Sequence, residues 1–220
     1  MYVSKMVIFV LILYKMTEII FTRHGQTEWN VARKMQGQLD SPLTEMGLLQ
    51  ARMLGAYLKD KSISAVYSSP LLRAQRTATI IRKEIGLENL ELSPALKEIN
   101  LSDLEGKSFS KASEEEPERM QAFSSHPSAF VPGPGGETFE EVQKRALGFI
   151  LPLFDRHNGQ RIIVVCHAVV LRLMMAYFES YTIDEYWKVH GFFFPCSITS
   201  VCRENGSYIL LQRNSIEHSK

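Results

Sequence analysis

The sequence predicts an α/β protein, a three-layer sandwich in which a mostly parallel central sheet is flanked by helices and carries a small cap insertion. Two observations support this class. Short β-branched runs alternate with helix-length amphipathic segments, without repeats or low-complexity tracts. The length of 220 residues, with 45% hydrophobic and 22% charged content, suits one globular domain. We expect that domain to occupy residues 16–220.

Short runs with the composition of strands recur along the chain. They are residues 18–22, 65–68, 90–92, 162–166, 198–203 and 208–212. The last two runs are separated by residues 204–207, whose Asn-Gly pair is a hairpin signal. We therefore expect an antiparallel edge on an otherwise parallel sheet.

Helix starts are indicated by capping residues followed by apolar residues at three- or four-residue spacing. Thr44 can cap one such segment, and Thr138 with Glu141 forms a capping box for another. Ser69 as N-cap with Pro70 at the first position predicts a further helix, which places Arg73 in its first turn. A fourth helix is expected to begin near Ala168.

Residues 107–137 are rich in Ser, Glu, Pro and Gly. This composition interrupts the alternation of strands and helices, so we expect a cap or lid insertion over the functional site. Phe109, Phe123, Phe130 and the phenylalanine run at 192–194 could line an apolar part of that site, although most aromatic residues belong to cores.

The formal net charge is +1, which gives no whole-molecule field that would recruit nucleic acid or an anionic membrane. Any anion site must therefore be a local pocket. The 3 cysteines, Cys166, Cys196 and Cys202, lack the spacing of metal or redox motifs. We interpret them as reduced, buried residues of a cytoplasmic protein.

An apolar stretch at residues 6–14 precedes the first predicted strand. It is shorter than the about 20 residues that span a bilayer, and no cleavage site of small residues follows it. We expect Met16 to be the natural start, with residues 1–15 derived from an upstream start codon or forming a loose extra segment. An N-terminal membrane anchor is the less favoured alternative.

The segment Arg23-His24-Gly25 lies at the end of an apolar, strand-like run. Ligands of α/β enzymes are held at such strand ends. The guanidinium group of Arg23 suits phosphate oxygens and the imidazole of His24 can act as a nucleophile. This combination indicates phosphoryl transfer through histidine.

Further blocks follow this segment in order. They are Gln36-Gly37, Asp40-Ser41-Pro42-Leu43-Thr44, Ser68-Ser69-Pro70-Leu71-Leu72-Arg73-Ala74, Leu96-Lys97-Glu98 and Val164-Val165-Cys166-His167. Together they resemble the histidine phosphatase superfamily, whose relatives include cofactor-dependent phosphoglycerate mutase. The resemblance extends from about residue 17 to about residue 212.

The resemblance implies a role for each matching residue. His24 would be the nucleophile, and Arg23 and Arg73 would neutralise the phosphate. His167 would stabilise the transferring phosphoryl group. Glu98 would donate a proton to the leaving group and then act as the base for water. The nearby acids Asp103 and Glu105 do not match the motif.

The phosphate cradle is expected to be completed by Asn30, Gln36 and Gly37. Ala168 departs from the family, which usually has glycine directly after the second histidine. Its methyl group could crowd the substrate, or it could be harmless if the backbone there is that of a helix start. Neither a metal nor a cofactor is required by this chemistry, and no spacing in the chain suggests a metal site.

Hydrolysis of a small-molecule phosphate ester is the favoured function, with a metal-independent phosphohistidine mechanism. The mutase branch of the family carries an arginine and a tyrosine after the proton-donor glutamate, whereas this chain has Ile99 and Asn100. The mutase branch also has a pair of arginines in a longer insertion, whereas the insertion of this chain has a single arginine, Arg119. The alternatives are a cofactor-dependent phosphoglycerate mutase and a non-catalytic module that binds phosphorylated ligands. The sequence leaves the oligomeric state open, and a homodimer is compatible with it.

Overall fold

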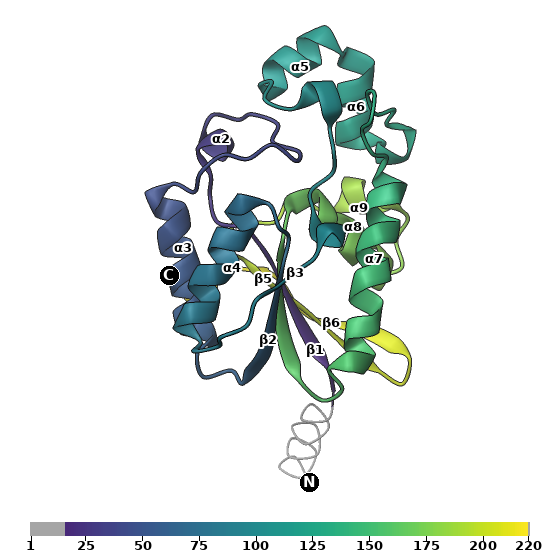
Figure 1. Ribbon diagram of the computed structural model, residues 1–220. Coiled ribbons are helices and arrows are strands. Elements are labelled where there is room, and N and C mark those ends of the chain that lie inside the picture. Colours follow the sequence, from purple (N-terminus) through teal and green to yellow (C-terminus); the bar gives the residue numbers. More distant parts are fainter. Residues whose placement is uncertain (1–15, 220) are drawn as a thin grey trace.

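The computed structural model of the protein describes residues 16–219 and is built around a 6-stranded sheet (Figure 1). The strands are β1 (Glu18–Arg23), β2 (Ile63–Ser68), β3 (Glu91–Leu92), β4 (Arg161–Cys166), β5 (Ile198–Glu204) and β6 (Ser207–Ser215). Their order is β3-β2-β4-β1-β5-β6. Strands β3, β2, β4 and β1 run parallel, while β5 and β6 pair antiparallel. The predicted fold class and antiparallel edge are confirmed.

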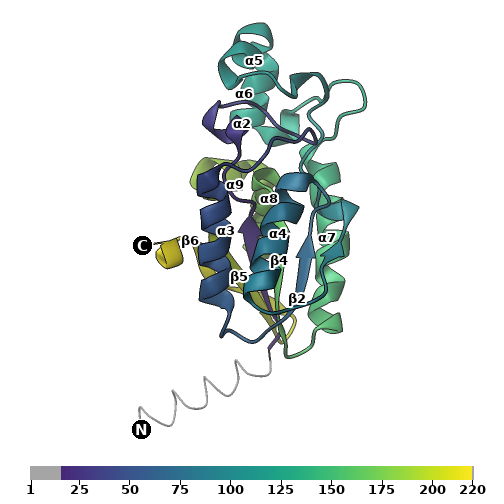
Figure 2. The same ribbon diagram turned by 60° about the vertical axis from the view of Figure 1, so that its left-hand side comes forward.

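Helices cover both faces of the sheet (Figures 1 and 2). One face carries α3 (Glu45–Leu58) and α4 (Leu72–Glu84), and the other carries α7 (Phe139–Arg156) and α8 (Ala168–Phe178). The shorter helices are α2 (Glu28–Val31), α5 (Phe109–Glu115), α6 (Pro117–Ser125) and α9 (Ile183–Val189). Single 3₁₀ turns occupy Pro94–Leu96, Ser102–Leu104, Pro127–Ala129 and Glu217–Ser219. Sequence patterns missed α9 because its 7 residues are too few for a clear apolar period.

The two faces of the sheet bury separate apolar clusters. Along β1, Ile19 and Phe21 contribute to the cluster under α7 and α8, whereas Ile20 contributes to the cluster under α3 and α4. Along β4, Val164 contributes to the cluster under α7 and α8, and Val165 to the cluster under α3 and α4. This alternation buries both central strands on both faces, as expected for the parallel part of a sandwich.

Three of the predicted helix starts are confirmed. Thr44 accepts a hydrogen bond from Gly47 N–H, Thr138 and Glu141 form the capping box, and α8 begins at Ala168. The prediction for α4 was wrong, because its N-cap is Leu71 and not Ser69.

A distant carboxylate replaces the missing side-chain cap of α4. Asp40 accepts hydrogen bonds from the N–H groups of Leu72 (2.7 Å) and Arg73 (3.3 Å). These groups have no partner inside the helix and attract negative charge. A tertiary cap of this kind cannot be recognised from the local sequence. Arg73 nevertheless lies in the first turn, as predicted.

The register of the central strands brings three loops to one edge of the sheet. Arg23 of β1 lies opposite Cys166 of β4, and Ser68 of β2 lies opposite Val165. The residues that leave these strands, Ser69, His167 and His24, therefore follow one another along the carboxyl ends of β2, β4 and β1.

Residues 107–137 contain α5 and α6, which stand above the carboxyl ends of the strands in Figure 1. The end of this segment lies beside the chain that leads into it, since Glu137 N–H donates to Asn100 O at 3.0 Å. Near its start, Phe109 N–H donates to Arg33 O (3.1 Å) and Met35 N–H donates to Lys107 O (2.9 Å). Backbone bonds thus tie its base to the loop that follows α2.

Residues 1–15, where we expect an extra segment, lie outside the described residues. Within residues 16–219, no helix is long and apolar enough to cross a membrane. All three cysteines are buried and free, as predicted.

Two glycines allow α3 to approach the loop after β1 closely. A methyl group on Gly25 would lie 2.5 Å from the carbonyl oxygen of Gly47, and a methyl group on Gly47 would overlap with the carbonyl oxygen of Gln26. Both obstacles are backbone atoms, which cannot rotate away. The first turn of α3 therefore fixes the position of the residues next to His24.

This contact predicts opposite effects for two glycines in helices. Gly47→Ala is expected to lower the free energy of unfolding by about 1–3 kcal/mol because it overpacks backbone against backbone. Gly148→Ala in α7 is the matched control, since a methyl group there meets no other part of residues 16–219 within 4 Å, and it is expected to stabilise by about 0.5–1 kcal/mol through helix propensity. Urea unfolding of both variants measures the difference, and stabilisation by Gly47→Ala would contradict the close approach.

Candidate active site

A cavity of about 420 Å³ opens at the carboxyl ends of β1, β2 and β4. It contains most of the residues that the sequence predicted for the site. These are Arg23, His24, Asn30, Gln36, Gly37, Arg73, Glu98 and Ala168. His167 completes the set, because its ring centroid is 5.2 Å from that of His24. The predicted residues therefore meet at one place.

His24 is buried at the end of β1 and hydrogen-bonded to its own loop. Its Nδ1 lies 2.8 Å from the carbonyl oxygen of Gly25. A carbonyl oxygen only accepts, so Nδ1 carries the proton and Nε2 keeps a free lone pair. Burial, followed by the charges of Arg73 and Arg23, holds the pKa of His24 well below its usual value. The ring is therefore neutral and nucleophilic near pH 7.

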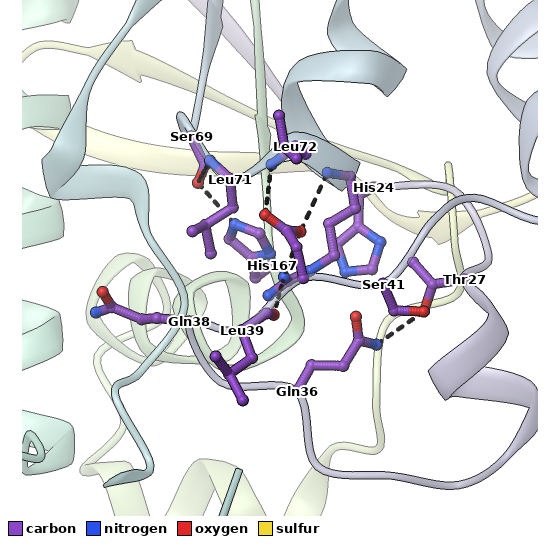
Figure 3. Close-up of polar contacts among 12 residues, drawn as sticks. His24, Thr27, Gln36, Gln38, Leu39, Ser41, Ser69, Leu71, Leu72 and His167 are labelled. Atoms are coloured by element: carbon purple, nitrogen blue, oxygen red, sulfur yellow. Dashed lines mark hydrogen bonds and ion pairs between the residues drawn. The ribbon is translucent and has the colours of Figure 1, made fainter. Parts of the chain in front are cut away.

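His167 is fully buried beside His24, and Figure 3 shows both rings with Ser69. Its Nε2 is 2.8 Å from Ser69 Oγ, while its Nδ1 has no hydrogen-bond partner among residues 16–219. Burial is the largest cause of a pKa well below the usual histidine value, with Arg73 next. A neutral ring with one unsatisfied nitrogen thus lies close to the nucleophile.

Arg23 and Arg73 place two guanidinium groups at the cavity. Arg23 Nη1 donates to Phe193 O at 3.0 Å. Arg73 pairs with Asp40 at 2.8 Å and also donates to Gly37 O (2.6 Å) and Leu39 O (2.7 Å). Burial lowers the pKa of both arginines, although Glu98 opposes this shift.

Several buried polar atoms of this site lack partners within the described part of the chain. They are Arg23 Nε, Arg73 Nε, His167 Nδ1 and Gln36 Oε1. Buried polar groups are normally hydrogen-bonded, because an unpaired one costs about 1–3 kcal/mol. The three nitrogens suit an anion.

Glu98 is buried just after the 3₁₀ turn Pro94–Leu96. Its carboxylate accepts hydrogen bonds from the N–H groups of Ile99 (3.1 Å) and Val169 (3.2 Å). Burial raises the pKa of Glu98, and this outweighs the opposing effect of these N–H groups and of Arg73 and Arg23. The group is a candidate proton donor at a pH where an ordinary glutamate is ionised.

Arg145 of α7 holds the segment that carries Glu98. It donates to the carbonyl oxygens of Lys97 (2.7 Å) and Glu98 (3.2 Å) and pairs with Glu137 (2.7 Å). Sequence reasoning missed this residue, because nothing in α7 predicts where a long side chain ends.

The neighbouring acids have other partners. Glu105 accepts hydrogen bonds from Gln38 N–H (2.8 Å) and Leu39 N–H (3.0 Å), so it shapes the loop after Gly37. Asp103 forms two hydrogen bonds of 3.0 Å with Arg119. Arg119, which lies in residues 107–137, is thus held in an ion pair with Asp103.

Asn30 and Gln36 belong to a small network around Thr27 (Figure 3 shows Gln36 and Thr27). Asn30 Oδ1 accepts from Thr27 N–H at 3.1 Å in the capping box of α2, so the amide NH₂ of this cavity-lining residue stays available. Gln36 Nε2 donates to Thr27 Oγ1 at 2.9 Å. The role of Thr27 was not foreseen from the sequence.

Ala168 is the first residue of α8, so its backbone is helical and its methyl group causes no backbone strain. Phe109, Phe123 and Phe192 line the cavity. Phe130 and Phe193 belong instead to the apolar core.

Asp40 and Ser69 also contact site residues without having been predicted to do so. Both stand in the sequence blocks that surround the site, Asp40 before Ser41-Pro42 and Ser69 before Pro70. Their position in these blocks is the sequence signal that could have identified them as site residues, since their partners, Arg73 and His167, come from distant parts of the chain.

Comparison with known proteins agrees with this geometry. The chain is 41% identical over 160 residues to the metal-independent phosphoserine phosphatase of Arabidopsis thaliana, which covers 72% of this chain and 67% of that protein. The structure named Bacillus stearothermophilus YhfR superposes with a TM-score of 0.87 at 35% identity, covering 93% of this chain and 100% of that chain. The structure of a phosphoserine phosphatase variant from Entamoeba histolytica, in complex with phosphoserine, superposes with a TM-score of 0.81 at 27% identity. The match covers 92% of this chain and 99% of that chain.

A family model described as the histidine phosphatase superfamily (branch 1) matches residues 19–216, which include every residue of the cavity described above. The chain therefore belongs to the histidine phosphatase superfamily.

Proposed function

We propose that this protein is a metal-independent phosphatase that hydrolyses small-molecule phosphate monoesters through a phosphohistidine on His24. One observation carries the proposal. A buried, neutral imidazole with a free Nε2 lone pair shares a cavity with the guanidinium groups of Arg73, which is buried, and Arg23, which is half-buried. Each keeps a buried nitrogen without a partner among residues 16–219. Such a set neutralises a phosphate dianion and presents a nucleophile to its phosphorus.

The first step transfers the phosphoryl group to the enzyme. His24 Nε2 attacks phosphorus, a P–N bond forms and the ester P–O bond breaks. Arg23, Arg73 and an N–H of His167 stabilise the charge on the equatorial oxygens. Glu98 donates its proton to the departing oxygen, because an alkoxide is a poor leaving group.

The second step releases phosphate. Glu98, now a carboxylate, accepts a proton from water as the water oxygen attacks phosphorus. The P–N bond breaks, inorganic phosphate leaves and His24 returns to its neutral form. Glu98 regains a proton in the same step, so the cycle closes without a metal ion.

The surroundings of Glu98 favour hydrolysis over the mutase reaction. A mutase must hold a second anionic group near the transferring phosphate, whereas Ile99 and Leu101 present apolar side chains at the cavity. Arg119 is paired with Asp103 and is not free for a second anion. We expect residues 107–137 to serve as the cap over the leaving group, since Phe109 and Phe123 line the cavity from there.

Phosphoserine is the first substrate to test, because relatives of this chain are named phosphoserine phosphatases. If the amide of Gln36 turned by about 180°, its NH₂ group would take the place of Oε1, which has no partner within residues 16–219, and the Thr27 hydroxyl would then donate to Oε1. Thr27 Oγ1 already accepts from Asn30 N–H, so its proton is available for that arrangement.

His24→Ala is expected to lower phosphate release by about 10³-fold or more, because no phosphohistidine can form. The assay measures phosphate released from a panel of monoesters, including phosphoserine, in the presence of EDTA. His126→Ala is the control, since His126 is exposed and does not line the cavity. Loss of the wild-type activity on adding EDTA would contradict a metal-independent mechanism. Absence of release from every ester would favour the mutase or the binding module.

Glu98→Gln is expected to separate substrates by their leaving groups. Phosphoenzyme formation from an alkyl phosphate should slow by about 10²–10⁴-fold, because the departing alkoxide is no longer protonated. Formation from a nitrophenyl phosphate should change little, because its leaving group is stable as an anion. Rapid-quench measurement of the first turnover checks this contrast, and equal slowing of both esters would exclude Glu98 as the proton donor.

The pH dependence follows from the two shifted groups. The first step needs neutral His24, whose pKa lies well below the usual 6.5, and protonated Glu98, whose pKa lies above the usual 4.5. Activity should therefore persist below pH 6.5, where an ordinary histidine is charged, and should decline as the pH rises through the raised pKa of Glu98. Profiles of kcat/KM for an alkyl ester check this, and the decline with rising pH should disappear in Glu98→Gln.

A further inference from the structure

Ser69 lies directly behind His167, on the neighbouring strand end. The two residues leave β2 and β4, which pair in parallel with Ser68 opposite Val165. Both side chains are completely buried, and His167 Nε2 lies 2.8 Å from Ser69 Oγ (Figure 3). This contact is not required by the fold of α4, because Ser69 is not the N-cap of that helix.

The direction of this hydrogen bond determines which nitrogen of His167 carries the proton. A neutral imidazole has one N–H and one lone pair, so a donor at Nε2 forces the proton onto Nδ1. Ser69 Oγ already accepts a hydrogen bond from Leu71 N–H at 3.3 Å. Its hydroxyl proton has no other acceptor among the residues that the structure describes, so it is free to point at Nε2.

The remaining nitrogen, Nδ1, is the one without a partner within residues 16–219. A phosphoryl group offers only acceptor oxygens, so Nδ1 must carry a proton to bind it. The opposite tautomer would present a lone pair to the phosphoryl oxygens and repel them. The arrangement around Ser69 is therefore the one that a phosphate site needs.

We propose that Ser69 is a positioning residue, whose hydroxyl donates to His167 Nε2 and thereby holds the proton of the ring on Nδ1, facing the phosphoryl group. The catalytic consequence rests on the proposed phosphatase function, whereas the tautomer itself is a property of the resting protein. A wrong tautomer can remove most of the benefit of a correctly placed histidine.

Ser68 provides a matched control. It is the preceding residue, it is equally buried, and its hydroxyl donates to the carbonyl oxygen of Ser69 at 2.9 Å and not to His167. Replacing Ser68 with alanine removes its hydrogen bond to Ser69 O, whereas replacing Ser69 removes the hydrogen bonds with Leu71 N–H and with His167. Only the Ser69 change reaches the ring.

The tautomer can be read directly by two-bond ¹⁵N–¹H NMR correlation on protein labelled in its histidine rings. The His167 signals are assigned by their loss in His167→Gln. We expect an Nδ1–H signal in the wild type and in Ser68→Ala, and its loss or partial replacement by Nε2–H in Ser69→Ala. Adding inorganic phosphate should shift the Nδ1 resonance of the wild type.

Kinetics provide the second measurement. Ser69→Ala is expected to lower kcat/KM by about 10–100-fold, the order of one lost transition-state donor, and Ser68→Ala should stay within about twofold. Ser69→Thr, which retains a hydroxyl, should restore the Nδ1–H signal. If Ser69→Thr does not fold, the alanine pair alone decides the question.

The proposal is overturned if wild-type His167 carries its proton on Nε2, or if Ser69→Ala leaves the tautomer unchanged. It also fails if both serine variants lower kcat/KM equally. If the wild type hydrolyses no ester but shows the Nδ1–H signal that Ser69→Ala loses, the proposed function fails while the assignment of Ser69 stands.

Discussion

The site depends on the in-register, parallel pairing of β1 with β4. Because Arg23 and Cys166 are cross-strand partners, the next residue of each strand emerges at the same level, and two histidines from distant parts of the chain become neighbours. Their ring centroids are 5.2 Å apart. A slip of one residue would turn each side chain to the opposite face of the sheet. The two apolar clusters prevent this slip, since both faces of these strands are buried.

Charge imposes the second constraint. Burial, together with the charges of two neighbouring arginines, suppresses protonation of both histidine rings, and the field of the arginines favours an anionic ligand. The protein offsets the cost at Arg73 with Asp40 and backbone carbonyl groups, and at Arg23 with the carbonyl group of Phe193. Some nitrogens have no partner within residues 16–219. A bound phosphate would supply acceptors that the described part of the chain does not, so ligand binding should stabilise the fold as well as begin the reaction.

Much of the fold and the principal site residues could be predicted from the sequence, because strand composition, helix caps and the motif blocks are local signals. The placement of His24 and Glu98 at one cavity followed from such blocks. What could not be predicted depends on tertiary contacts. Asp40 caps α4 from a separate loop, which is why the start of that helix was misplaced. Arg145 reaches the segment of Glu98 from α7, and Gly47 matters because another backbone crosses it.

The junction between Asn100 and Glu137 has a consequence for how such proteins diversify. The chain leaves and re-enters the α/β domain at two adjoining backbone groups, joined by a hydrogen bond of 3.0 Å. Exposed positions between them can change in length and sequence at little cost to the sheet or to the two histidines, whereas Leu104 and Phe130 belong to the core and Glu105 holds the loop after Gly37. Part of the wall that would meet the leaving group is encoded in that stretch, through Leu101, Phe109 and Phe123. Selection for a new substrate could therefore act on an exchangeable module while the machinery for phosphoryl transfer is inherited unchanged.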